Sequence, residues 1–128
     1  MKRLTYFVPG KPIAFARAGS HGTRRYTPKL QADYMRQVQL ECLRMMKLGK
    51  VSRFEGPIRM TVEAVFRVPR GKTAGWKATR TDLDNTLKIH ADALNSLAYQ
   101  DDGQICELIA RKTYGLGEGV TVTIEELE

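Results

Sequence analysis

Five aspartates lie within 21 residues of a chain that is otherwise basic: Asp82, Asp84, Asp92, Asp101 and Asp102. Carboxylates held close together repel one another unless a cation offsets their charge. Mg²⁺ suits this role, because it binds one or two carboxylates together with water and phosphate oxygens. Mg²⁺ is therefore the natural candidate for a cation that these aspartates would bind.

The first two acids stand in the segment "TDLDNTLK", Thr81 to Lys88. In an extended segment, residues two apart face the same side, so Asp82 and Asp84 would present both carboxylates together while Leu83 points into the core. Asp84 is also placed to cap a following helix, a common structural role that contributes about 1 kcal/mol. Capping accounts for one aspartate but not for the set.

Lys88 stands four residues after Asp84 and four before Asp92, on one stripe of the expected helix. Two interpretations remain open. A solvated ion pair at this spacing is worth only about 0.3 to 0.5 kcal/mol. A lysine one turn from a metal would instead stabilise charge on a phosphate.

Asp101 and Asp102 belong to "YQDDGQ", which predicts a turn because Asp-Gly is a favoured turn pair. The turn needs only one aspartate. Either member of the pair can face the metal, and the sequence leaves both open.

The surrounding pattern predicts a single α+β domain over residues 1–128, with a mixed β-sheet and two main helices in the order β-α-β-α-β-β. Apolar residues at alternate positions predict a strand within Gly56–Pro69 that is buried on one face. Its inward residues would be Ile58, Met60, Val62, Ala64 and Phe66. Further strands are expected at 3–10, 105–115 and 120–127, and Gly115 to Gly119 is expected to form a hairpin turn.

The first helix is expected over 27–50, with Thr27 as its cap, Pro28 in its first turn and Gly49 at its end. Helical spacing predicts a buried stripe made of Leu30, Tyr34, Val38, Leu40 or Cys42, Met45 and Leu48. The second helix is expected from Asn85 to Ala98, with Leu87, Ala91, Leu94 and Ala98 on its apolar face.

The composition sets the class of protein. Twenty-one Lys and Arg against fourteen Asp and Glu give a net charge of +7, which suits a polyanion such as nucleic acid but also fits a protein that is merely basic. Cys42 and Cys106 stand alone and predict buried side chains rather than a zinc site or a disulfide. No apolar run is long enough to span a bilayer, so we expect a cytoplasmic protein that binds no membrane.

Two basic segments, at 11–26 and 70–80, have little apolar periodicity and predict exposed loops that could hold phosphates. The candidate contacts in and beside them are Lys11, Arg17, Arg24, Arg25, Arg67, Arg70, Lys72, Lys77 and Arg80. Trp76, the only tryptophan, could stack on a base or pack against the second helix.

The run "DLDNTLKIHADAL", followed by "YQDDGQI", resembles the RusA family of Holliday junction resolvases. Members of that family share Asp-x-Asp-Asn-x-x-Lys, then Asp-Ala-Leu, then Asp-Asp and a Gln. The match is close over Asp82 to Ile105, and the rest agrees in layout alone. Asp-x-Asp would be weak by itself, but the combined spacing is specific.

The resemblance implies a homodimeric endonuclease that binds four-way DNA junctions and, with Mg²⁺ or Mn²⁺, cuts two strands symmetrically in recombination and repair. Asp82, Asp84 and Asp102 would bind the metal, and Lys88 would be the catalytic lysine. Two alternatives remain: a metal-dependent nuclease acting on other branched DNA, and a non-catalytic basic DNA-binding protein whose aspartates only cap and turn.

Overall fold

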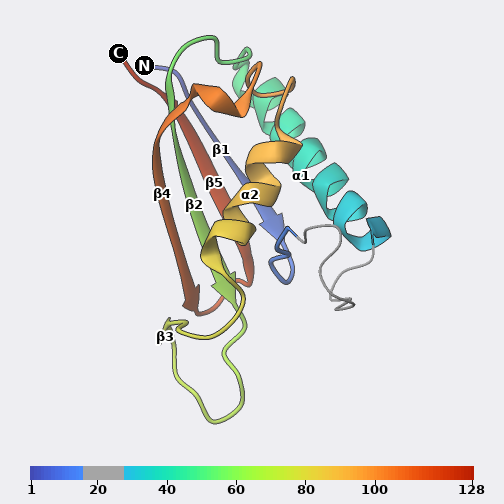
Figure 1. Cartoon of the computed structure of the whole chain (residues 1–128), viewed down its shortest axis with the longest axis vertical. Coiled ribbons are helices and arrows are strands. Elements are labelled where there is room, and N and C mark those ends of the chain that lie inside the picture. The colour runs from blue at the N-terminus through green and yellow to red at the C-terminus, as the bar shows by residue number, and fades with distance from the viewer. Residues whose placement is uncertain (16–27) are drawn as a thin grey trace.

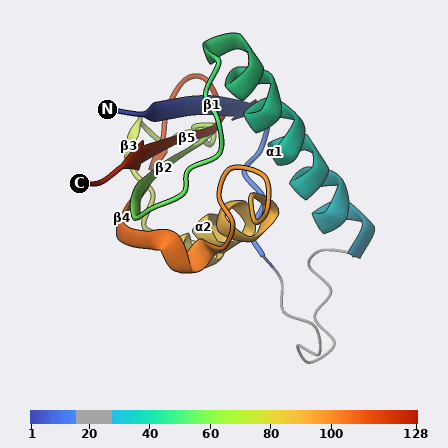
Figure 2. The ribbon, with the colours of Figure 1, turned by 90° about the horizontal axis from the view of Figure 1, so that it is seen from above.

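A computed structural model describes residues 1–15 and 28–128 and has the expected α+β architecture. Five strands form one mixed sheet in the order β1-β5-β2-β4-β3, and helices α1 and α2 lie on one of its faces (Figures 1 and 2). The chain order β-α-β-α-β-β is confirmed, apart from the short extra strand β3. The fold class predicted from the sequence is therefore correct.

Strand β2 (Ile58–Phe66) is the centre of the core. Its burial alternates along its whole length, as the sequence predicted, because only the helix-facing side chains are covered. Strand β5 (Gly119–Glu126) pairs antiparallel with one edge of β2, and β4 (Ile105–Tyr114) pairs parallel with the other. Strand β1 (Arg3–Pro9) extends the sheet beyond β5.

The glycine segment after β4 does not form the predicted hairpin. Strands β4 and β5 are not neighbours, because β2 lies between them. The segment crosses the end of β2, where the Gly115 N–H donates to the Phe66 carbonyl at 3.0 Å. Gly119 has a φ of 155°, and a Cβ there would lie 2.4 Å from the Phe7 ring and 2.6 Å from the Val8 carbonyl. This crossing makes β4 parallel to β2 and leaves it near the sheet's edge.

Helix α1 (Pro28–Gly49) begins and ends close to the predicted bounds, and the proposed cap, Thr27, lies outside the described residues. Tyr34, Val38 and Cys42 form its buried row. The wider stripe was wrong: Leu30, Leu40, Met45 and Leu48 are exposed. The contacts of α1 with β1 and α2 fully bury one i, i+4 row, and Met35 and Met46 beside it are partly buried.

Helix α2 (Leu83–Ala93) is five residues shorter than predicted at its C-terminal end. Ser96 takes a φ of 69°, a left-handed conformation that does not continue a helix. Beyond the helix, Leu94, Ala98 and Tyr99 are still fully buried. The apolar spacing therefore identified core residues correctly but overestimated the length of the helix.

A buried histidine joins α2 to its two neighbours. His90 Nδ1 lies 2.8 Å from the Tyr6 hydroxyl of β1, and Nε2 lies 3.0 Å from the Tyr34 hydroxyl of α1. Burial lowers the pKa of His90 to about 3, so the ring is neutral at ordinary pH. This bridge fixes the position of the helix that carries Asp84 and Asp92 and directly follows Asp82.

The structure also tests the expectations for the two cysteines and for a membrane span. Cys42 is buried, as predicted, but Cys106 is exposed because it lies on β4 near the sheet's edge. Within residues 1–15 and 28–128, no helix combines the length and apolar character needed to cross a bilayer.

Candidate metal and nucleic-acid site

Asp82 and Asp84 lie at the N-terminal end of α2, and both are exposed. Asp82 occupies the cap position with an extended backbone, and its side chain makes no capping hydrogen bond. Asp84 belongs to the first turn of the helix, so the expectation that it caps the helix is wrong. The segment also turns into helix at Leu83 instead of staying extended. Neither carboxylate is committed to capping, which leaves both open to a ligand.

Lys88 lies midway along α2 and makes the ion pair that its spacing allows. Its Nζ is 3.3 Å from a carboxylate oxygen of Asp92 and 5.0 Å from the centre of the Phe15 ring. Phe15 is fixed in turn by its backbone N–H, which donates to the Asn85 carbonyl at 2.8 Å. Asp92 was noted in the sequence only as part of a polar stripe. The structure makes it the immediate partner of the candidate catalytic lysine.

The two adjacent aspartates of the turn have different surroundings. Asp101 accepts a hydrogen bond from the Gly103 N–H at 2.8 Å and forms a capping box with Gln104, so it serves the short helix Asp102–Gln104. The carboxyl group of Asp102 lies close to that of Asp92. Burial and the nearby carboxyl groups of Asp101 and Asp92 raise the pKa of Asp102, and the charge of Lys88 partly offsets them. Asp102 is therefore the member of the pair that faces α2.

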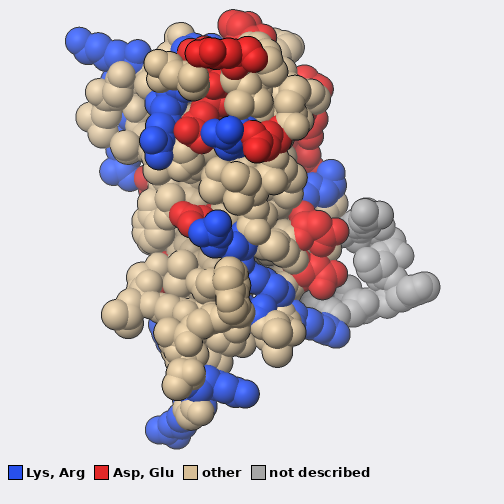
Figure 3. Space-filling view, turned by 90° about the vertical axis from the view of Figure 1, so that its left-hand side faces the viewer, with Lys and Arg blue, Asp and Glu red and all other residues tan. Residues whose placement is uncertain are grey.

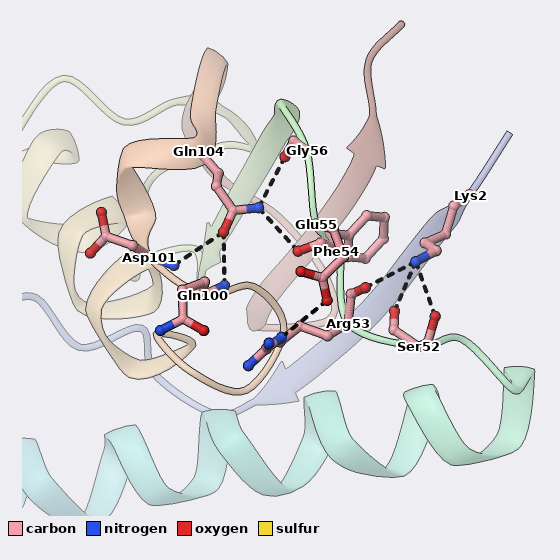
Figure 4. Close-up of polar contacts among 9 residues, drawn as sticks. All are labelled: Lys2, Ser52, Arg53, Phe54, Glu55, Gly56, Gln100, Asp101 and Gln104. Carbon is pink, nitrogen blue, oxygen red and sulfur yellow. Dashed lines mark hydrogen bonds and ion pairs between the residues drawn. The ribbon is translucent and has the colours of Figure 1, made fainter.

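Gln104 fixes this turn against the segment before β2 (Figure 4). Its Oε1 accepts from the N–H groups of Gln100 and Asp101, and its Nε2 donates to the carbonyls of Phe54 and Gly56, both at 3.0 Å. The Asp102 N–H donates to Asn95 Oδ1 at 2.8 Å. The sequence carried a signal for Gln104, since a glutamine three residues after a capping aspartate is typical of a capping box.

The acids gather at two ends of α2. Asp82 and Asp84 lie at its start, whereas Asp92 and Asp102 lie near its end, and an 11-residue helix is about 16 Å long. Each pair has the hard oxygen donors that Mg²⁺ prefers. Within the described part of the chain, however, no three potential ligands come close enough to hold one metal ion. One chain therefore presents two carboxylate pairs with Lys88 between them.

Lys77 does not lie in the open as a phosphate contact would. Its side chain is only 9% exposed, and its Nζ donates to Thr79 Oγ1 at 2.9 Å and to the Arg80 carbonyl. Lys112 Nζ donates to the carbonyls of Thr79, at 2.5 Å, and Thr81. The two lysines hold the segment that leads directly into Asp82, a role that the sequence did not reveal.

Other basic candidates are exposed. Lys11, Arg67, Arg70, Lys72 and Arg80 are open to solvent, and blue side chains occupy the lower tip in Figure 3, where the segment between β2 and β3 (Gly75–Trp76) projects. Arg17, Arg24 and Arg25 lie outside the described residues. Trp76 is 76% exposed, so it does not pack into the core or under α2.

Comparison with known proteins places this arrangement in a family. The profile of the family described as Endodeoxyribonuclease RusA matches residues 9–125, almost the whole chain. The chain belongs to the RusA endodeoxyribonuclease family. The resemblance predicted from "DLDNTLK" and "QDDGQ" is thus confirmed.

A similar protein adds no functional detail. The uncharacterized protein YqaN of Bacillus subtilis (strain 168) is 32% identical over an 84-residue alignment that covers 56% of this chain. The match spans 59% of that protein's length. RusA membership therefore rests on the family profile and on the motif residues of this chain.

Proposed function

We propose that this RusA-family protein is a magnesium-dependent endonuclease that resolves four-way DNA junctions as a homodimer, in recombination and repair. The observation that carries the proposal is the family match together with uncommitted carboxylates at Asp82 and Asp84 and the orientation of Asp102 toward Lys88. Mn²⁺ would substitute for Mg²⁺, because both accept oxygen ligands.

The residues divide the chemistry among themselves. Asp82, Asp84 and Asp102 would hold the metal, and a metal bound there would supply an activated water and polarise the phosphate. Lys88 would stabilise the charge that develops on the phosphate oxygens. Its contact with Asp92 keeps the ammonium beside the acids at the end of α2.

DNA must approach an acidic centre, so basic groups around it have to hold the phosphates. Lys11, Arg70, Lys72 and Arg80 are exposed and suit this role, and Arg17, Arg24 and Arg25 remain candidates. Lys77 is withdrawn from the set because its ammonium is used within the chain. Trp76, exposed at the base of the basic loop, would stack on a base at the opened junction.

The test compares a labelled four-way junction with a linear duplex of the same sequence, each with and without Mg²⁺. We expect paired symmetric nicks in the junction, with Mg²⁺ or Mn²⁺ only, and little cutting of the duplex. Cleavage of flaps in preference to junctions would favour a different branched substrate. Junction binding without any metal-dependent product would favour a non-catalytic DNA-binding protein.

A further inference from the structure

Two lysine side chains converge on the segment between β3 and α2 (Figure 1). Lys77 directly follows β3, and its backbone N–H donates to the carbonyl of Lys112 on β4 at 3.4 Å. The Nζ of Lys77 donates to the hydroxyl of Thr79 at 2.9 Å and to the Arg80 carbonyl. The Nζ of Lys112 donates to the carbonyls of Thr79, at 2.5 Å, and Thr81. Three consecutive carbonyls therefore accept from an ammonium group.

The ammonium group of Lys77 is buried beside neutral groups. Lys77 is only 9% exposed, and its Nζ lies 4.8 Å from the centre of the Phe66 ring and 5.5 Å from that of the Tyr114 ring. Among the ion pairs of residues 1–15 and 28–128, none includes Lys77 or Lys112. A charge taken out of water is strongly unfavourable unless hydrogen bonds compensate it. The hydrogen bonds to the neighbouring backbone thus tie the burial of this lysine to the shape of the segment.

The held segment has little other support. Residues 78–81 belong to no helix or strand, and in the part of the chain that the structure describes they make no backbone–backbone hydrogen bond. The hydroxyl of Thr79 shares one further hydrogen bond, with the hydroxyl of Tyr114 at 3.1 Å. Loop backbone without such contacts loses much conformational entropy when it is fixed. The two lysines therefore determine the path by which the chain enters α2.

Asp82 is the residue whose orientation depends on this path. The Thr81 carbonyl, which accepts from Lys112, belongs to the peptide bond that joins Thr81 to Asp82. Asp82 has an extended backbone, with φ −69° and ψ 132°, and its side chain makes no capping hydrogen bond. The direction of its carboxylate is set by the backbone on its two sides, which are α2 and the carbonyl held by Lys112.

We propose that Lys77 and Lys112 are positioning residues of the metal site, which direct the carboxylate of Asp82 through the backbone carbonyls that they hold. In this role neither lysine touches the metal or the DNA. The inference rests on the proposed function in taking Asp82 as a metal ligand, and it deepens that proposal by adding two residues outside the motif "DLDNTLK". Removal of the outer groups that orient a ligand typically weakens metal binding about 10- to 100-fold.

The first test measures Mn²⁺ affinity without DNA, from the electron paramagnetic resonance signal of free Mn²⁺. Lys112→Met removes the ammonium group and keeps a side chain of similar length, so the Kd for Mn²⁺ should rise about 10-fold or more. Lys112→Arg still donates to carbonyls and should recover most of the affinity. Lys47→Met, at an exposed position of α1, is the matched control and should bind as the wild type does. An unchanged Kd in Lys112→Met would overturn the proposal.

A double substitution shows whether the effect passes through Asp82. Once the Asp82 carboxylate is removed, a lysine that acts only by directing it has nothing left to position. Asp82→Asn combined with Lys112→Met should therefore bind Mn²⁺ within about twofold of Asp82→Asn alone. A second loss as large as that of Lys112→Met in the wild type would indicate a general effect on the fold and contradict the proposal.

Cleavage assays on the same variants separate this inference from the nuclease proposal. In Lys77→Met and Lys112→Met, the single-turnover rate of junction cleavage should fall about 10- to 100-fold, because a displaced ligand misplaces the reacting groups. Junction affinity in gel shifts should change less than twofold. Equal losses of rate and junction affinity would make the lysines DNA contacts and overturn the inference.

The wild type distinguishes the two possible failures. If it cuts junctions and both lysine variants cut equally fast, this inference alone is wrong. If it binds Mn²⁺ and cuts nothing, the nuclease proposal is wrong and the Mn²⁺ affinities of the variants decide this inference. A wild type that binds no Mn²⁺ would overturn both.

Discussion

The carboxyl group of Asp102 lies close to that of Asp92, one residue before the end of α2, whereas the neighbouring Asp101 accepts a hydrogen bond within its own turn. Two adjacent aspartates thus have two different roles. Asp101 stabilises the turn that carries Asp102, and Asp102 brings a carboxylate toward Lys88. The relationship orients the third acid of the proposed centre toward α2.

This division predicts that the two aspartates fail differently when replaced. Asp101→Ala removes a cap, so the free energy of unfolding should fall by about 1 kcal/mol and the melting temperature should fall with it. The maximal rate of junction cleavage should stay within a few-fold of the wild-type rate. Asp102→Ala should abolish cleavage with little change in melting temperature. Melting curves and single-turnover cleavage rates, measured on the same two variants, distinguish the two roles. Loss of cleavage in Asp101→Ala without loss of stability would make Asp101, and not Asp102, the third acid of the site.

Asp84→Asn is expected to keep junction binding and to abolish Mg²⁺-dependent cleavage, because it removes a ligand charge with little change of shape. The structure sharpens this prediction, since Asp84 does not cap α2 and the stability cost should be no more than about 1 kcal/mol from the helix dipole. Gel-shift and cleavage assays on one preparation measure both effects. An active Asp84→Asn enzyme would rule out this carboxylate as a metal ligand.

Lys88→Ala should reduce the cleavage rate by about 100-fold or more and leave junction affinity nearly unchanged, because charge on the phosphate would lose its stabilising cation. Lys29 provides the matched control, since it makes an exposed i, i+4 ion pair with Asp33 at 2.9 Å. This pair lies in α1, far along the chain from the aspartates of the candidate site. Lys29→Ala should not alter the rate. Equal and small effects of both changes would reduce Lys88 to a surface ion-pair partner.

The sequence predicted the parts of the fold that local periodicity determines. The alternation of β2 and the row Tyr34, Val38 and Cys42 follow directly from which side of each element is covered. The sequence did not predict the order of the strands in the sheet, because a glycine-rich segment after β4 is compatible with a tight hairpin and equally with a crossing over the end of β2. Strand pairing depends on contacts distant in sequence, which a local pattern does not contain.

The site shows the same limit. Residue type and spacing singled out Asp82, Asp84, Lys88 and the Asp-Asp pair, but the choice of Asp102 needed the hydrogen bonds of Asp101 and Gln104. Lys77 was misjudged because a lysine in a basic loop is usually solvated, whereas here tertiary contacts place it over the rings of Phe66 and Tyr114. Burial of single side chains in loops is set by the fold.

The buried histidine predicts an acid-sensitive fold. The pKa of His90 falls from 6.5 to about 3 on folding, so the unfolded chain binds the extra proton between these values and stability is lost as the pH falls below 6.5. The free energy of unfolding should drop by up to about 1.4 kcal/mol per pH unit from this group. His90→Gln, which keeps polar atoms near both tyrosines but cannot titrate, should reduce that slope in urea titrations from pH 7 to 4. Equal slopes in the two proteins would contradict the prediction.

Complementation tests whether two chains build each site. Asp82→Asn and Asp102→Asn should each be inactive alone, since every site of either homodimer lacks an acid. If Asp82 of one chain acts with Asp102 of the other, a heterodimer of the two variants keeps one intact site. When equal amounts of the two variants are unfolded and refolded together, the mixture should regain about one quarter of the wild-type number of intact sites. Each heterodimer would cut one strand only, so the product should be a nicked, unresolved junction. The mixture of Asp82→Asn with Asp84→Asn is the matched control. It should stay inactive, because Asp82 and Asp84 lie at the same end of α2 and every site in that mixture lacks one of them. If each site is contained within a single chain, both mixtures should be inactive.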